Sequence, residues 1–114
     1  MDLVNDIQKL MEELTTSIKL LRKNGNDLAV AERDYKVCLR LEALKLRSEE
    51  NMPVTLINQI IYGIPNVADK RFKRDVAETM RDVNLEHIYA TKLKLRLLEA
   101  QLQREWGSIN KGEL

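Results

Sequence analysis

The chain has 114 residues, of which 44% are hydrophobic, 4% are aromatic and 32% are charged, and its formal net charge is +1. An aliphatic, Leu/Glu/Lys/Arg-rich composition of this kind is typical of long helices, and we expect a single all-α domain. The nearly balanced charge argues against a protein that wraps nucleic acid along its whole surface, although it leaves room for a local basic patch.

Cysteine usage and the N-terminal sequence bear on the compartment. Cys38 is the single cysteine, so the sequence cannot form an internal disulfide. Residues 1–6 are acidic where a secretory signal would be basic, and no apolar run approaches the length of a membrane span. We therefore expect a cytoplasmic protein that does not enter a membrane.

Apolar residues at helical spacing predict one helix over about residues 2–50, with Asp2 as its N-cap. The main stripe consists of Leu3, Ile7, Leu10, Leu14, Ile18, Leu21, Leu28, Ala31, Tyr35, Leu39, Ala43 and Leu46. A second stripe consists of Val4, Met11 and Ile18, followed by Val30, Val37, Leu41 and Leu44. The apolar face of this helix is therefore broad.

The turn signal at Asn24-Gly25-Asn26 leaves two interpretations open. Asp27 could cap a new helix there, so that the chain would turn back on itself. A glycine inside a helix costs only about 1 kcal/mol, however, and residues 2–50 match residues 66–106 in length only as one rod. We favour a helix that continues through Gly25.

Residues 51–66 predict a corner. Pro53 suits the first turn of a short helix over about residues 53–62, which Gly63 would end. Its buried side would carry Leu56, Ile57, Ile60 and Ile61. Asn66 would then cap the last helix, with Asp69 three residues later as in a variant of the capping box.

The last helix is predicted over about residues 66–106, ending at Gly107, with residues 108–114 as a flexible tail. One stripe along it consists of Phe72, Val76, Met80, Val83, His87, Ala90, Leu93 and Leu97, and a second of Ile88, Leu95, Leu98, Leu102 and Trp106. The sequence thus predicts a long antiparallel helical hairpin, similar to a coiled coil, in one domain over residues 1–107.

Two helices that each carry two apolar stripes have more apolar surface than one hairpin can bury. Each leucine left in water forgoes roughly 1.5–3 kcal/mol of burial. We therefore expect a homodimer in which two hairpins form a four-helix bundle. The predicted oligomer interface consists of Leu93, Leu95, Leu98, Leu102 and Trp106.

The basic cluster Lys70, Arg71, Lys73 and Arg74 is the sharpest charge feature. Cations near a helix N-terminus oppose the helix dipole, so the cluster could contact nucleic acid or an acidic partner. The plainer interpretation is ion pairing with Asp69, Asp75, Glu78, Glu49 or Glu50. A helix-turn-helix over residues 54–74 is a further alternative, although Pro65 lies in its turn.

Residues that could carry chemistry are few. His87 has no second histidine or cysteine at ligand spacing, and Cys38 has no neighbouring histidine that would activate it. Glu42, Glu49 and Glu50 form a dense carboxylate group, but the Glu-x-x-His spacing of metal sites in helical bundles does not occur. We predict no catalytic residue, no metal and no cofactor, and therefore a non-enzymatic protein.

Four segments carry a resemblance to a known group of proteins: residues 31–36, 52–57, 71–77 and 105–106. They resemble small helical proteins from the early (replication and recombination) gene region of tailed phages and prophages of Gram-positive bacteria. The resemblance implies a bacterial host cytosol and a setting of single-strand-binding and recombinase proteins. It implies no catalytic activity, and the apolar corner at residues 62–65 departs from the group's pattern.

These observations lead to one expected function and one alternative. We expect a non-enzymatic phage or prophage accessory protein that acts through protein–protein interaction in DNA replication or recombination. The alternative is a weak nucleic-acid-binding protein that uses the basic start of its last helix.

Overall fold

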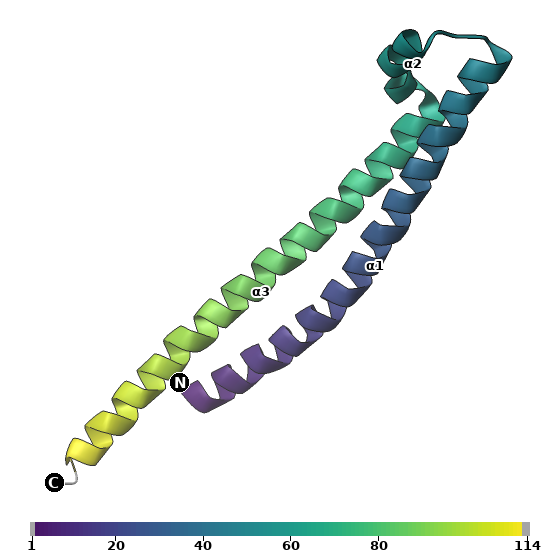
Figure 1. Ribbon diagram of the computed structural model, residues 1–114. Helices are drawn as coiled ribbons and strands as arrows, with labels where there is room; N and C mark the ends of the chain where they lie inside the picture. The colour runs from purple at the N-terminus through teal and green to yellow at the C-terminus, as the bar shows by residue number, and fades with distance from the viewer. Residues whose placement is uncertain (1, 113–114) are drawn as a thin grey trace. The chain divides into compact units, whose positions relative to one another are not determined.

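A computed structural model describes the backbone of residues 2–112 and the side chains of residues 2–108. Its elements are α1 (Leu3–Glu49), α2 (Val54–Ile60), the 3₁₀ helix η1 (Ile61–Gly63) and α3 (Pro65–Gly112), as Figure 1 shows. The described residues contain no strand, which confirms the all-α prediction. The chain divides into two compact units: residues 1–22 with 82–114 form unit 1, and residues 23–81 form unit 2.

The first helix begins and continues as predicted. The Asp2 carboxylate accepts a hydrogen bond from the backbone N–H of Asn5 at 3.2 Å, so Asp2 caps α1. The helix passes through Gly25 without a break. It ends at Glu49, and Asn51 follows in the left-handed region at φ 50°, which asparagine tolerates better than most residues.

The corner belongs to unit 2 and packs through two of its four predicted core residues. Ile57 and Ile61 are buried with Tyr35 and Val67 in one cluster. Leu56 and Ile60 are exposed, which corrects the prediction. The reason is geometric: Ile57 and Ile61 share one side of the corner, whereas Leu56 and Ile60, each one residue earlier, point about 100° away from it.

The start of α3 also differs from the prediction. Pro65 is its first residue, so Asn66 lies inside the helix and is not its cap. A proline suits this position because its φ is already helical and it has no N–H to satisfy. The Asn66 side chain instead donates to Glu42 Oε1 at 3.4 Å, and the N–H of Ala68 donates to the carbonyl of Ile64 at 2.8 Å.

The end of α3 lies beyond the predicted stop at Gly107. The helix continues to Gly112, so most of the expected flexible tail is helical, and residues 113–114 lie outside the described residues. No glycine among the described residues has a positive φ. Gly107 is therefore an ordinary helical residue, which costs only about 1 kcal/mol relative to alanine.

Within unit 1, the seam between α1 and α3 contains polar residues. Leu3, Ile88 and Leu95 are buried, and so are Ser17 and Thr91. The buried Asn84 side chain donates to the carbonyl of Ser17 at 3.1 Å. The buried Thr91 hydroxyl donates to the carbonyl of His87 at 2.8 Å. These hydrogen bonds explain why polar side chains are tolerated in the seam.

The stripe of α3 that faces α1 is the second of the two predicted stripes. Ile88 and Leu95 are buried and Leu98 and Leu102 are half-buried, whereas the first stripe is exposed, with Phe72 66% exposed. His87, which belongs to this first stripe, is exposed too and does not lie on the seam. The first stripe is the more continuous in sequence. The side chains that pack against α1, however, are those that recur every three or four residues from Val67 to Leu102.

Candidate interaction surface

In unit 2, α1 and α3 run antiparallel, and the corner covers one side of the pair. The contacts of Glu42 with Asn66 and of Tyr35 with Arg74 show the antiparallel order. Buried Ile57 and Ile61 bring the corner against α1, and partly buried side chains pack around them: Cys38, Leu39, Ala43, Leu46, Met52 and Ile64. This side of the pair is therefore closed within the chain.

The opposite side of the pair is apolar and exposed. Leu39 packs against the corner, and Val37, two residues earlier, points about 200° away from it. Val37 is 52% exposed and Leu41 is 61% exposed. Two grooves run along this side: one is lined by Asp27, Val30, Ala31, Asp34, Lys70 and Lys73, the other by Arg33, Asp34, Val37, Cys38, Leu41, Glu42 and Lys70.

We call this side the uncovered face and define it by Val30, Val37 and Leu41 of α1 and Lys70 and Lys73 of α3. It continues along α3. Met80 lies two helical turns after Lys73 and so shares its side of the helix, and Met80 is exposed. The uncovered face thus has apolar side chains on both helices, and the two grooves along it are lined by charged side chains of both signs.

The basic cluster is partly engaged within the chain. Lys73 pairs with Asp69 at 3.2 Å, and Arg74 pairs with Asp75 at 2.9 Å, as the ion-pairing interpretation predicts. The guanidinium of Arg74 lies 4.7 Å from the ring centre of Tyr35, and that of Arg71 lies 5.4 Å from the ring centre of Tyr62. Both arginines therefore lie within cation–π distance of an aromatic ring.

Arg74 and Lys70 differ in what they offer a partner. The hydrogen bond to Asp75 raises the pKa of Arg74 above its ordinary value, and desolvation lowers it in part. The side chain of Arg74 is only 24% exposed, so it has little surface for a ligand. Lys70 lines both grooves of the uncovered face, and within the described residues it has no carboxylate partner.

The residues of the predicted oligomer interface do not form one exposed patch. Leu93 and Trp106 are exposed. Leu95 is 8% exposed and belongs to the seam of unit 1, and Leu98 and Leu102 are half-buried. Leu95 is therefore occupied by packing within the chain.

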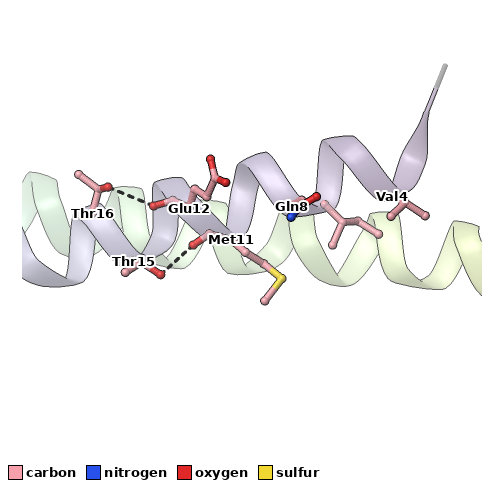
Figure 2. A pocket seen from close by; sticks show the side chains of 7 residues that line it. Val4, Gln8, Met11, Glu12, Thr15 and Thr16 are labelled. Atoms are coloured by element: carbon pink, nitrogen blue, oxygen red, sulfur yellow. Dashed lines mark hydrogen bonds between the residues drawn. The ribbon is translucent and has the colours of Figure 1, made fainter.

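Unit 1 has an apolar groove of its own on α1, shown in Figure 2. It is lined by Val4, Ile7, Gln8, Met11, Glu12, Thr15 and Thr16. The hydroxyl of Thr15 donates to the carbonyl of Met11 at 3.0 Å, and that of Thr16 donates to the carbonyl of Glu12 at 3.1 Å. Because the helix backbone satisfies both hydroxyl donors, the groove offers mainly apolar contact to a partner.

Sequence reasoning missed the buried polar residues of the seam. Asn84 and Thr91 lie four residues before and three residues after Ile88, which is the spacing of a helix seam. That spacing is the signal that could have identified them. Cys38 is half-buried and packs beside the unit 2 cluster as a small apolar residue.

The described residues contain no group of three or more histidine, cysteine, aspartate or glutamate side chains that could hold a metal ion. None of the described helices is both long enough and apolar enough to cross a membrane.

Comparison with known proteins finds no matching family model, no matching curated protein and no matching solved structure.

Proposed function

We propose that this chain is a non-enzymatic assembly protein that acts by packing its helices against another helical polypeptide, in the first place a second copy of itself. One observation carries the proposal. Among the described residues, twenty large apolar side chains are exposed and eight are buried. With the half-buried side chains counted too, a single copy of the chain leaves about half of its large apolar side chains exposed to water.

The exposed side chains follow the helices in rows, which suits packing against helices. Val30, Val37 and Leu44 recur every seven residues on α1, and Val76, Val83 and Leu97 recur at multiples of seven on α3. Rows at this spacing are what a neighbouring helix needs for knobs-into-holes packing. Each fully buried side chain of this size stabilises an interface by roughly 1.5–3 kcal/mol, so a few rows favour a four-helix bundle.

The molecular mass in solution tests the proposal. Multi-angle light scattering should give a mass that rises from that of one chain, 13.3 kDa, to twice that value as the protein concentration increases. The thermal midpoint should rise over the same range, because association stabilises the folded chain by mass action. A mass of one chain at every concentration, with an unchanging midpoint, would contradict the proposal.

The resemblance at residues 71–77 and 105–106 supports a cellular setting for this assembly protein. We propose that it is a phage or prophage accessory protein that docks on a protein of DNA replication or recombination. Fluorescence titration of the labelled chain with a purified single-strand-binding protein and with a recombinase tests this setting. Absence of saturable binding to both would remove the setting and leave the helix-packing proposal intact.

Nucleic-acid binding through the basic cluster is the second candidate. The observation in its favour is the position of Lys70 in two grooves without a carboxylate partner in the described residues. The ion pairs of Lys73 and Arg74 weaken it. Gel shifts with single- and double-stranded DNA at low salt should then weaken as salt rises, with a slope of only about −1 to −2 for one or two phosphate contacts.

A further inference from the structure

We infer that the uncovered face of unit 2 is the surface on which a second copy of this chain docks, with α1 of one copy lying against α3 of the other. The inference rests on the proposed helix-packing function and names its surface and its occupant. Two observations carry it: which side the corner closes, and how charge is distributed on the other side.

The corner leaves this face as the open side of unit 2. Ile57 and Ile61 close the side that carries Leu39 and Ala43. Val37 and Leu41, each two residues before one of these, point about 200° away and are 52% and 61% exposed. A second helix pair laid on Val30, Val37 and Leu41 would bury them, as the corner buries the opposite side.

The charges that line the first groove are segregated by helix, whereas the second groove also contains the basic residue Arg33 from α1. The acidic residues that line the first groove, Asp27 and Asp34, come from α1, and the basic residues, Lys70 and Lys73, come from α3. A two-fold axis parallel to the helices would place α1 of each copy over α3 of its partner. The acidic row of each copy would then face the basic row of the other, and the complementary contact would form twice.

The same segregation disfavours other occupants. A uniformly acidic partner helix would face Asp27 and Asp34, and a uniformly basic one would face Lys70 and Lys73. A dimer with α1 against α1 would bring the two acidic rows together. Like charges placed opposite each other suppress such arrangements, so the mixed face favours a second copy in the α1-to-α3 arrangement.

The first test removes the apolar contact. Val37→Glu places a carboxylate at the centre of the face, and it should weaken dimerisation at least about tenfold, as truncation of a central interface residue does. Val54→Glu on α2 is the matched control, because Val54 is similarly exposed but lies outside the face, and it should leave the dissociation constant unchanged. Circular dichroism should show the helical content of the wild type for both variants.

The second test exchanges the charges of the acidic residues of α1 and the basic residues of α3. Asp34 and Lys70 line the same grooves, so Asp34→Lys alone and Lys70→Glu alone should each weaken the homodimer. An equimolar mixture of the two variants should restore dimerisation, because each copy then offers the partner the opposite charge at both contacts. Repulsion inside a single chain would persist in the mixture, so restoration reports contact between copies.

The outcomes separate the two proposals. A wild type that is monomeric at all concentrations overturns the helix-packing function and this inference together. A dimer that Val37→Glu leaves intact, or one that neither charge variant weakens, overturns this inference alone. Native mass spectrometry of the mixture, with one variant isotopically labelled, identifies the heterodimer directly.

Discussion

Arg74 is a charged side chain in a largely packed position, and two groups account for its place there. Its guanidinium lies 4.7 Å from the ring centre of Tyr35 and 2.9 Å from the carboxylate of Asp75, with 24% of the side chain exposed. The methylene stem can pack while the charged head keeps a ring and a carboxylate as partners. Arg74 therefore serves the contact between α1 and α3 in unit 2.

Arg74→Ala should lower the free energy of unfolding by about 1–2 kcal/mol, because it removes the cation–π contact and the packing of the stem together. Arg74→Lys should lie between the wild type and Arg74→Ala, since lysine keeps the charge but cannot stack as a plane. Urea unfolding followed by circular dichroism measures both.

Arg71→Ala is the matched control for Arg74→Ala. Arg71 faces the exposed Tyr62 at 5.4 Å, so its removal should change the free energy of unfolding by less than about 0.5 kcal/mol. If Arg71→Ala and Arg74→Ala lowered the free energy of unfolding equally, the burial of Arg74 would add nothing to the strength of its contact with Tyr35.

Asn84 is the buried polar residue whose partner is best defined. Its amide donates to the carbonyl of Ser17 at 3.1 Å across the seam of unit 1. Asn84→Ala should lower the free energy of unfolding by about 1 kcal/mol, even though alanine has the better helix propensity. Asn26→Ala, at an exposed position of α1, should instead raise it by about 0.5 kcal/mol. A gain in both variants would show that the seam hydrogen bond contributes nothing.

At the scale of the elements, the continuity of α1 can be tested at Gly25. A methyl group added there would meet no atom within 4 Å, and the glycine has no positive φ. Gly25→Ala should therefore raise the free energy of unfolding by about 1 kcal/mol, the difference in helix propensity. Gly107→Ala, also with nothing within 4 Å, is the control on α3. Destabilisation by Gly25→Ala alone would mean that the helix is broken at this glycine.

The elements themselves could be predicted from the sequence, because apolar spacing and turn residues act locally. The Asp2 cap and the short corner helix follow from such local signals. The continuity of α1 through Gly25 needed a further argument, the matching lengths of the two long helices, because the local signal there is that of a turn. The choice between the two stripes of α3 could not be made this way, because it depends on which stripe meets α1. The stripe that does so includes Asn84 and Thr91, whose hydrogen bonds no count of apolar residues reveals.

The candidate site shows the same division between local and distant contacts. The ion pair of Lys73 with Asp69, four residues earlier, could be predicted from helical spacing alone. The stacking of Arg74 on Tyr35 could not, because the two residues are 39 positions apart and meet only through the register of unit 2. The uncovered face was likewise hidden, since its definition requires knowing which side the corner occupies.

At the scale of the whole molecule, the two units differ in what they bury. Unit 2 contains the cluster of Tyr35, Ile57, Ile61 and Val67, with the corner packed onto the helix pair. Among the described residues of unit 1, the buried apolar residues are Leu3, Ile88 and Leu95, and polar residues share the seam. Regions that bury fewer apolar contacts open locally at lower free energy. Unit 1 should therefore open first, although both units share the same two long helices.

Hydrogen exchange followed by mass spectrometry, at a concentration where the chain is monomeric, measures this difference. Backbone amides in residues 23–81 should exchange more slowly than those in residues 1–22 and 82–108. Ile57→Ala removes a large side chain from the unit 2 cluster and should cost about 2–5 kcal/mol there. It should therefore speed exchange in residues 23–81 and reduce or reverse the difference between the units. Equal protection in the wild type would instead mean that α1 and α3 open as single cooperative rods, with the corner adding nothing to unit 2.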